Sequence, residues 1–222
     1  MITDMLAPFA FVVAAYLVGS IPFPLLIGRL KGIDLRSVGS ANVGAGNLTR
    51  TGGFPAGLAG AALDGWKGLL PVVVGTQAQL GAGTVGAAVL AAVAGHNWSV
   101  FLRGRSGRGL ATSAGALLGL NASLVVWPFA WAVAGWKIGG GLGGFVGWGL
   151  LPLYAYIAGS PSIEVAVTSG LAVLMIVRRA QGNDGRAPWW GPLVHRVVFD
   201  RDRSPVADVV PVAGEAERPI HT

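Results

Sequence analysis

Long apolar runs constrain the fold of this 222-residue chain more than any other feature. A helix needs about 20 consecutive apolar residues to span the hydrocarbon core of a bilayer. The chain is 53% hydrophobic and only 12% charged, whereas soluble domains are about 25% charged. The sequence therefore predicts an all-α integral membrane protein. The apolar runs lie at about residues 6–28, 54–76, 80–102, 110–136, 141–159 and 162–177.

The fourth run, residues 110–136, is long enough for two helices. It contains Asn121 and Pro128, and we expect two short helices that meet near residues 120–123. The segment 109–120 would rise only about 18 Å as a helix, which is less than the bilayer core of about 30 Å. Neighbouring helices would therefore have to cover it. We favour seven spans, some of them short or broken, with six as the alternative.

Basic residues cluster in alternate breaks between the runs and after the last run. The breaks at residues 76–84 and 159–162 contain neither Lys nor Arg. Because cytoplasmic loops are enriched in Lys and Arg, seven spans put every basic break on the cytoplasmic side, with the N-terminus outside and the C-terminus inside. Six spans would put Lys137 or the tail on the wrong side. The clustered basic residues are Arg29, Lys31, Arg36, Arg50, Arg103, Arg105, Arg108, Lys137, Arg178 and Arg179.

The composition excludes several kinds of site. The chain has no Cys, so it contains no disulfide, thiol nucleophile or Cys-ligated metal. Its three His are scattered along the sequence without an acidic cluster, so we expect no metal and no other cofactor. The formal net charge is +6, and its clustering in loops fits a membrane surface or anionic substrates rather than nucleic acid.

The composition changes near residue 180. Residues 1–180 are the predicted polytopic membrane domain, and residues 181–222 are a polar, Pro-rich cytoplasmic tail that we expect to be partly disordered. The stretch "PWWGPLVHRVVF" within the tail would suit the membrane interface, where Trp is favoured. We assign no function to the tail or to His195 and His221 within it.

The segment "VGSANVGAGNLTR", residues 38–50, is the first candidate for a binding site. Its glycines would let the backbone approach a ligand closely and offer unobstructed N–H groups. Ser40, Asn42 and Asn47 add neutral hydrogen-bonding groups, and Arg50 adds a planar guanidinium that matches phosphate. The segment therefore predicts a phosphate-binding loop. The alternative is a flexible loop whose arginines only set the membrane topology.

A second segment, residues 95–113, repeats this chemistry as "GHNWSVFLRGRSGRGLATS". Gly107, Arg108 and Gly109 precede an apolar run, so they suggest a nest of backbone N–H groups at a helix N-terminus, where anions are favoured. The spacing matches neither a Walker P-loop nor a Rossmann fingerprint. Two such segments on one membrane face indicate that two anionic groups are held together. Further candidate ligands in this segment are Arg103, Arg105, Thr112 and Ser113.

Charged or polar residues within the apolar runs are candidates for functional or structural contacts. Asp64 and Lys67 lie three residues apart, so on a helix they share a face and can pair. Such a pair either shapes the site or contacts a ligand directly. His96, near the cytoplasmic end of the third run, is either a hydrogen-bonded structural group or a catalytic or ligand-binding residue.

Three ordered blocks resemble the acyl-phosphate:glycerol-3-phosphate acyltransferases of bacterial membranes. They read "GSIPFPLLIGRLKGIDLRSVGSANVGAGNLTRTGG", "LDGWKG" and "GHNWSVFLRGRSGRGLATS", and the resemblance is strong over residues 16–115 and weaker to about residue 180. It implies a seven-span enzyme of the bacterial plasma membrane that transfers a fatty acyl group from acyl phosphate to the 1-hydroxyl of glycerol 3-phosphate. The products would be phosphate and lysophosphatidic acid, for phospholipid synthesis. The resemblance also implies that neither acyl-CoA nor a metal takes part.

The residues match the first two family blocks unevenly. In the first block the family places Ser and Arg in leading roles at substrate phosphate, and Ala41 and Gly46 stand here where Gly and Thr are common. The second block ends in residues 106–109, where Arg108 replaces the family's Lys and keeps the charge with a different phosphate-binding geometry. The residues that match the first block are Gly39, Ser40, Asn42, Gly44, Asn47 and Arg50.

The third family block follows the last run and departs furthest from the pattern. The family reads approximately H-R-E-N, whereas this chain reads "VRRAQGND", with Arg179, Gln181 and Asn183 in the corresponding region. This block belongs to the end of the site that would bind acyl phosphate. An inactive homologue, or one with another acyl acceptor, is therefore the main alternative, and an anion transporter is a further one.

Acyl phosphate is a mixed anhydride whose carbonyl is already activated. The sequence contains no G-x-S-x-G motif, so we expect direct attack by the acceptor hydroxyl without an acyl-enzyme. Arginines would neutralise the two anions, and backbone N–H groups of the glycine-rich segments would stabilise the oxyanion. His96 and a substrate phosphate oxygen are the two candidates for the general base. The acyl chain would lie between helices, within the membrane lipid.

Overall fold

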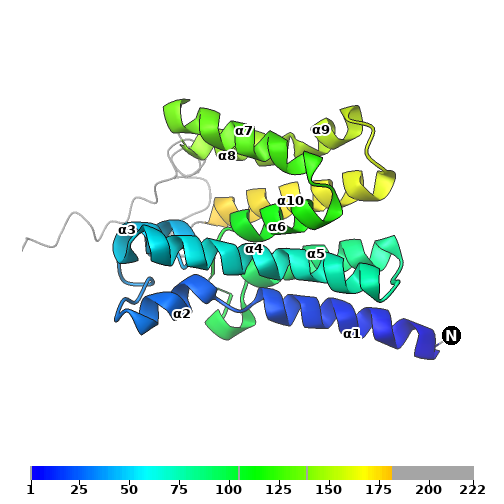
Figure 1. The fold of residues 1–222 in the computed structure, drawn as a ribbon, viewed down its shortest axis with the longest axis horizontal. Helices are drawn as coiled ribbons and strands as arrows, with labels where there is room; N and C mark the ends of the chain where they lie inside the picture. Colours follow the sequence, from blue (N-terminus) through cyan, green and yellow to red (C-terminus); the bar gives the residue numbers. More distant parts are fainter. Residues whose placement is uncertain (1, 105, 139, 182–222) are drawn as a thin grey trace, which may run out of the picture.

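The computed structural model describes residues 2–104, 106–138 and 140–181, and within them every regular element is a helix (Figure 1). Helices are expected because a bilayer core offers the backbone no hydrogen-bond partner other than itself. The prediction of an all-α membrane protein is confirmed. The elements are α1 (Ile2–Gly19), α2 (Phe23–Leu30), α3 (Ala45–Gly52), α4 (Phe54–Gln77), α5 (Ala82–Asn97), η1 (Val100–Leu102), α6 (Leu110–Leu120), α7 (Ser123–Ile138), α8 (Gly140–Gly149), α9 (Leu151–Ile157) and α10 (Ser162–Gln181).

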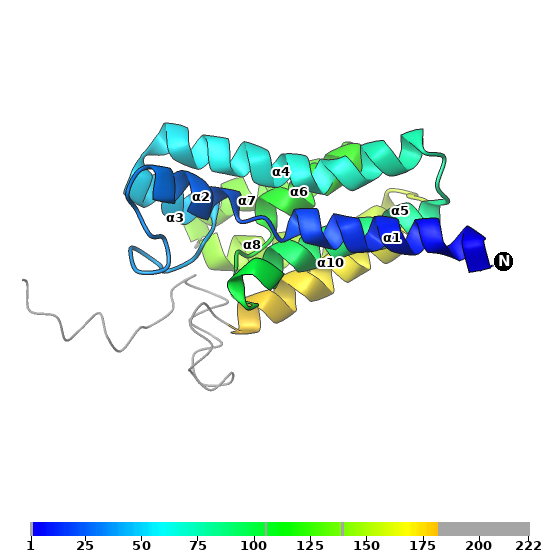
Figure 2. The ribbon, with the colours of Figure 1, turned by 90° about the horizontal axis from the view of Figure 1, so that it is seen from below.

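The helices run back and forth along the long axis of the molecule (Figure 1). α1 and α2 run in one direction, and α4 returns beside them (Figures 1 and 2). The later helices then alternate in direction, in the order α5, α6, α7, the pair α8 and α9, and α10. The α4–α5, α6–α7 and α9–α10 connections lie toward the end that holds the N-terminus. Residues 31–44, residues 106–109 and the last turn of α10 lie toward the opposite end, which we call the basic end. Its position on the cytoplasmic side and the number of seven spans stay predictions.

Helix length differs along the chain. Within the described ranges, the helical stretches long and apolar enough to cross a membrane are Leu6–Leu30, Phe54–Gln77 and Ala82–Leu102. α6 is apolar but has only 11 residues, which rise about 17 Å. It packs along α4, which covers one of its sides. The short α6 therefore depends on its neighbours, as the sequence predicts.

Asn121 separates α6 from α7 by a hydrogen-bonded cap. Its Oδ1 atom accepts hydrogen bonds from the backbone N–H of Ser123, at 3.1 Å, and from the Ser123 hydroxyl, at 2.6 Å. These bonds satisfy the start of α7, where helical N–H groups lack internal partners. The predicted division of the fourth run is confirmed, while Pro128 lies inside α7 and does not divide it.

Two other predicted runs are also broken. The first is interrupted at residues 20–22, where Pro22 precedes α2. The fifth is interrupted at Leu150, the N-cap of α9, which has Pro152 in its first turn. Proline has no N–H to donate and clashes with a preceding helical turn, so it ends or restarts a helix. The break at residues 20–22 matters for the site, because it leaves backbone carbonyls available deep in the bundle.

Glycines allow close contact between the helices beneath the basic end. A Cβ atom at Gly68 of α4 would collide with the Thr112 carbonyl of α6, and a Cβ at Gly115 would collide with the Gly65 carbonyl. Small residues of this kind let membrane helices approach backbone to backbone. On the outer surface, by contrast, large apolar side chains such as Phe9 and Phe129 are more than 60% exposed, as expected where lipid surrounds the protein.

Candidate functional site

Asn47 organises the first glycine-rich segment. Its side chain is 1% exposed. Its Oδ1 atom accepts a hydrogen bond from the Ser40 N–H at 3.1 Å, and its Nδ2 donates to the carbonyls of Leu35 and Val38 at 3.2 and 3.0 Å. A buried amide that bonds three backbone groups holds them in place. This geometry favours a role for Asn47 in shaping the loop, and direct contact with a ligand stays a prediction.

Ser40 and Arg50 lie together at the start and the end of this segment. The Arg50 Nη2 atom donates a hydrogen bond to the Ser40 hydroxyl at 3.2 Å, and the Arg50 side chain is exposed at the basic end. Within the described residues, no hydrogen bond reaches the buried Oδ1 atom of Asn42, whose amide lies against Gly44, the N-cap of α3. The structure therefore brings a hydroxyl and a guanidinium together, and a buried amide oxygen with no described donor lies in the same segment.

Asp34 holds Arg36 in an ion pair beside the same segment. The Arg36 guanidinium donates to both carboxylate oxygens of Asp34, at 2.6–3.2 Å. These side-chain hydrogen bonds, followed by the bond from the Arg36 backbone N–H, lower the pKa of Asp34 to about 2. Asp34 is therefore ionised at neutral pH, and its carboxylate keeps the Arg36 guanidinium bonded to it. Arg50, by contrast, bonds Ser40.

The second glycine-rich segment is packed against the end of α5. A Cβ atom at Gly107 would collide with the Nε2 atom of His96, and one at Gly109 would lie 2.7 Å from the Oδ1 atom of Asn97. Gly109 also has φ 77°, in the left-handed region, which glycine adopts without a steric penalty. Both glycines are therefore needed for the backbone path, and α6 begins directly after them.

The arginines of this segment have different surroundings. Arg103 is exposed and adopts the left-handed conformation with φ 53°. Arg105 lies outside the described residues. Arg108 is partly buried and lines a pocket described below. The structure therefore brings Arg108, and not Arg103, to the interior side of the basic end.

Asp64, Lys67 and His96 form a buried group below both segments. The Lys67 ammonium lies 2.9 Å from the Asp64 carboxylate, which confirms the predicted pair. Lys67 also donates a hydrogen bond to the Ile21 carbonyl at 2.7 Å, in the break between α1 and α2. The Nδ1 atom of His96 is 3.6 Å from Asp64, and its other side meets Gly107. The group thus connects the α1–α2 break to the second segment, which favours a structural role.

Thr112 and Ser113 are fully buried in helix contacts. Thr112 lies where α6 crosses Gly68 of α4, and the Ser113 hydroxyl is 3.9 Å from the sulfur of Met175 on α10. Both side chains are 0% exposed. Packing between helices accounts for their positions, and their predicted contact with substrate stays a prediction.

The end of α10 is docked onto the second segment. Arg178 is 5% exposed, and it donates hydrogen bonds to the carbonyls of Ser106 and Gly107, at 2.7 and 3.0 Å. The Gln181 side chain accepts a hydrogen bond from the Trp98 indole at 2.7 Å. The region that departs from the third family block is therefore structurally connected to the second. Asn183, together with His195 and His221, lies outside the described residues.

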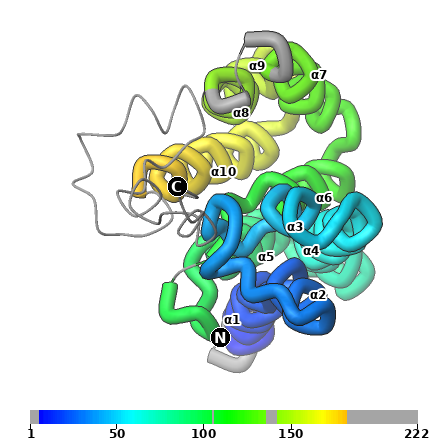
Figure 3. Tube along the Cα trace, turned by 90° about the vertical axis from the view of Figure 1, so that its left-hand side faces the viewer, coloured from blue at the N-terminus to red at the C-terminus, as the bar shows by residue number. Residues whose placement is uncertain are grey.

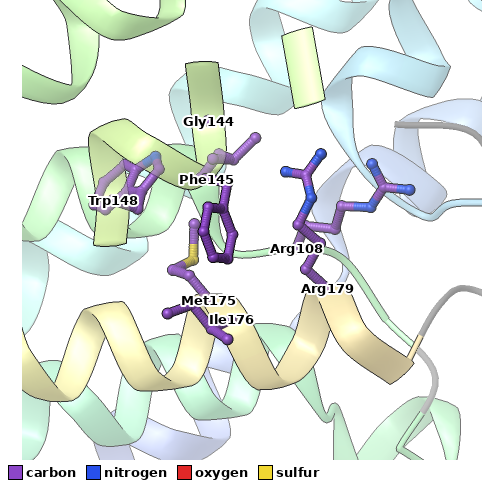
Figure 4. Close-up of a pocket in the computed structure, with 8 residues that line it drawn as sticks. Arg108, Gly144, Phe145, Trp148, Met175, Ile176 and Arg179 are labelled. Carbon is purple, nitrogen blue, oxygen red and sulfur yellow. The ribbon is translucent and has the colours of Figure 1, made fainter. Parts of the chain in front are cut away.

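A pocket of about 500 Å³, counting the space at its open mouth, lies between α6, α8 and α10. α10 is situated between α8 and α5 in the view from the basic end (Figure 3). The guanidinium groups of Arg108 and Arg179 lie side by side at one end of the pocket, and apolar side chains lie at the other (Figure 4). The remaining lining residues are Leu110, Gly144, Phe145, Trp148, Met175 and Ile176.

Sequence reasoning missed the contribution of α8 and of Arg178. The glycine-rich segment of α8 has the composition of an ordinary membrane helix, and nothing in it distinguishes Phe145 or Trp148 as pocket residues. In the sequence, Arg178 and Arg179 indicate membrane topology, and Arg179 also lies in the region of the third family block. Their adjacency to the last apolar run was the available signal, because a basic residue there can turn inward as well as toward solvent.

The helical bundle, its apolar outer surface and its basic end are those of an integral membrane protein with arginines gathered at one end. The chain belongs to the glycerol-3-phosphate acyltransferase family, whose model matches residues 9–186. A glycerol-3-phosphate acyltransferase from Geobacter sulfurreducens is 34% identical over 179 residues, which cover 80% of this chain and 92% of the relative. The resemblance seen in the sequence is confirmed.

Further relatives support the same family. A glycerol-3-phosphate acyltransferase from Thermus thermophilus is 47% identical over 115 residues, and the chain spans only 58% of that relative's length. Two crystal structures of PlsY (YgiH), an integral membrane glycerol 3-phosphate acyltransferase, share the fold. The glycerol 3-phosphate form has a TM-score of 0.72 at 32% identity, covering 84% of this chain and 97% of PlsY. The lysophosphatidic acid form has a TM-score of 0.71 at 31% identity, covering 78% and 88%.

Proposed function

We propose that this chain is a membrane acyltransferase that moves an acyl group from acyl phosphate to the 1-hydroxyl of glycerol 3-phosphate. The observation that carries the proposal is the pocket that joins two arginines to an apolar lining at the basic end. An acyl phosphate has the same division, with a phosphate at one end and a hydrocarbon chain at the other. The names of the relatives supply the acceptor, glycerol 3-phosphate.

The acceptor would bind at the first glycine-rich segment. Arg50 is exposed and bonded to Ser40, so a phosphate can contact the guanidinium and the hydroxyl together. The buried Oδ1 of Asn42, to which no other described group donates, is suited to accept a hydrogen bond from a glycerol hydroxyl. Asn47 then acts on the acceptor indirectly, because it holds the backbone of Ser40.

The donor would bind with its phosphate near Arg108 and Arg179 and its chain along the apolar part of the pocket. Two guanidiniums offset the charge of a phosphate that must enter a site of low polarity. Phe145, Trp148 and Met175 provide the apolar surface for the first carbons of the chain. In this proposal Arg179 supplies phosphate-binding chemistry in the region where the family's third block has other residues.

The transfer itself requires the acceptor oxygen to attack the acyl carbon. The new ester C–O bond forms while the bond between the acyl carbon and the phosphate oxygen breaks, and inorganic phosphate leaves with the electron pair. The hydroxyl proton passes to a phosphate oxygen. His96 is a weaker candidate for this base because it is 4% exposed and packed between Asp64 and Gly107. Orientation of the two bound substrates would lower the barrier by several kcal/mol, on the order of 7 kcal/mol at best geometry.

The test uses the purified protein in lipid nanodiscs with palmitoyl phosphate and labelled glycerol 3-phosphate. We expect labelled lysophosphatidic acid and one phosphate released per lysolipid formed. Palmitoyl-CoA in place of palmitoyl phosphate should give no product. A folded protein that forms no lysolipid from palmitoyl phosphate would contradict the proposal, and phosphate uptake into protein-containing liposomes without a donor would support a transporter instead.

A further inference from the structure

The pocket between α6, α8 and α10 is short compared with an acyl chain. On α8, Gly144 lies beside the Arg179 guanidinium, and Trp148 lies at the apolar end of the pocket (Figure 4). On α10, Arg179 and Met175 mark the same two ends. The two residues on each helix are four positions apart, which is about 6 Å along a helix. A lipid chain spans half of a bilayer core, about 15 Å, so the pocket encloses only the carbons next to the donor's carbonyl.

Trp148 closes the inner end of the pocket. It and Met175 are buried, and both belong to the hydrophobic core cluster that also contains Leu117 and Leu171. Trp148 and the two guanidinium groups lie on opposite sides of Phe145 (Figure 4). Because protein interiors are close-packed, a chain that has passed Phe145 meets the indole ring and, behind it, the core. The chain has no room to continue in this direction.

The rim of the pocket offers an exit into lipid. Leu110 and Ile176 line the pocket, yet they are 47% and 39% exposed. Both are apolar, as expected for side chains that face the hydrocarbon of a bilayer. The exposed face of α6 continues from Leu110 to Leu118. A path is therefore available from the pocket across Leu110 to the lipid beside α6.

We propose that Trp148 is a specificity-determining residue that selects acyl donors by the shape of their first carbons and not by the length of their chain. An unbranched chain enters the short pocket and turns out across Leu110 into lipid. A methyl branch beside the carbonyl needs space that the Trp148 ring occupies. The proposal rests on the proposed function for the identity of the donor, and it narrows the substrate class to acyl phosphates that are unbranched near the carbonyl.

Alkyl phosphates test this selection without turnover, because they cannot transfer their chain. Dodecyl phosphate and 2,2-dimethyldodecyl phosphate are titrated by calorimetry into the full-length protein in lipid nanodiscs. Probe concentrations are expressed as mole fractions in the bilayer, so that partitioning into lipid does not enter the Kd. We expect the wild type to bind the branched probe about tenfold more weakly, because a single methylene changes affinity in a hydrophobic pocket by about 10- to 200-fold.

The variant Trp148→Leu should remove this preference. Its smaller side chain leaves space for the branch, so we expect the two probes to bind about equally. Trp66→Leu is the matched change at an exposed Trp of α4, and it should keep the wild-type preference. An unchanged preference in Trp148→Leu would contradict the proposal. An equal loss of binding for both probes would also contradict it, because Trp148 would then only maintain the fold.

The exit path is tested by chain length. Butyl phosphate can stay within the pocket, whereas dodecyl phosphate must cross the rim. Leu110→Gln should weaken dodecyl phosphate binding about fivefold, because roughly half of the apolar contact of a Leu side chain is lost, and it should leave butyl phosphate binding unchanged. Leu58→Gln, at an exposed position in the part of α4 near the basic end, should bind both probes like the wild type.

Two results would show that the chain stays inside the protein and that the proposal is wrong. One is unchanged binding of dodecyl phosphate in Leu110→Gln. The other is a hexadecyl phosphate Kd that is much higher than the dodecyl phosphate Kd in the wild type, since a closed pocket would reject the longer chain.

Transfer assays with the wild type separate this proposal from the proposed function. A protein that transfers palmitoyl groups but binds the branched and unbranched probes equally has the proposed function without the selection. A protein that prefers the unbranched probe but forms no lysolipid from palmitoyl phosphate has the selection without the proposed function. Each of these results overturns one proposal and supports the other.

Discussion

The segment that carries Ser40 and Arg50 is stabilised by hydrogen bonds between its own residues, whereas residues 106–109 are stabilised by contacts with neighbouring helices. In the first segment Asn47 bonds backbone groups of its own loop. In the second, the backbone of Gly107 is packed on His96 of α5 and bonded to Arg178 of α10. Two segments with similar glycine-rich composition are thus stabilised in different ways, and their tolerance of mutation should differ accordingly.

This difference suits the two proposed ligands. A small water-soluble acceptor must enter and leave from the exposed side, where a self-supported loop with an exposed Arg50 is accessible. A lipid-like donor enters between helices, and its phosphate meets a backbone whose position α5 and α10 determine. Four sets of variants test the comparison, and the last of them has the smallest expected effect.

Glycine-to-alanine changes should have opposite outcomes in the two segments. Gly107→Ala places a methyl group on the His96 ring, so the backbone must shift, and a displacement of about 1 Å can lower kcat/KM by about 100-fold. Gly46→Ala adds its methyl group in open space within α3, where it should stabilise the helix by about 1 kcal/mol with normal activity. Initial rates of lysolipid formation and thermal unfolding measure both. Equal activity of the two variants would refute the comparison.

Variants of the buried pair beneath both segments test whether Asp64 and Lys67 have a structural role. Asp64→Asn leaves the Lys67 ammonium without its carboxylate, and breaking a buried ion pair costs about 3–5 kcal/mol of stability. The double variant Asp64→Leu with Lys67→Met removes both charges and should recover most of that loss. Denaturant titrations of the single and double variants measure this recovery.

The activity of the double variant then distinguishes the two roles left open by the sequence. Restored stability with restored lysolipid formation indicates a pair that only shapes the site. Restored stability without activity indicates that Asp64 or Lys67 contacts a ligand. The structure favours the first outcome, because Lys67 is already bonded to Asp64 and to the Ile21 carbonyl.

Arg50 and Arg108 should affect different substrates. Arg50→Ala is expected to raise the KM for glycerol 3-phosphate about tenfold and Arg108→Gln to raise the KM for acyl phosphate about tenfold, as each loses a charge-assisted hydrogen bond. Steady-state kinetics with each substrate varied in turn provide the test, and Arg36→Ala is the control for surface charge. If both variants raise the same KM, the two segments serve one substrate and the division between them is wrong.

The smallest effect concerns backbone strain in the first segment. Ala41 has φ 55°, a left-handed conformation that disfavours a Cβ atom, and the family commonly has Gly there. Ala41→Gly should stabilise the protein by about 0.5–1 kcal/mol, since relief of strain exceeds the added chain entropy. Ala45→Gly, at a helical position in α3, should have the opposite sign. Thermal unfolding of both variants gives the comparison, and a destabilised Ala41→Gly would contradict it.

Local signals predicted much of the architecture. The apolar runs indicated the membrane helices, the polar Asn121 indicated the break between α6 and α7, and the spacing of Asp64 and Lys67 indicated their pair. Each of these depends on residues close together in sequence. The breaks before α2 and α9 were missed because apolar residues continue on both sides of them.

The sequence by itself determined that this chain is a helical membrane protein with basic glycine-rich segments. The free energies of transfer into lipid and of helix formation are sums of contributions from residues close together in the chain, so they can be read from the sequence. Only the tertiary structure decided that Arg178 bonds the loop carbonyls while Arg179 lines the pocket. Two adjacent arginines on a helix point in different directions, and what each one meets depends on helices far away in the sequence. The role of a charged side chain follows from those distant neighbours, so composition and spacing alone do not assign it.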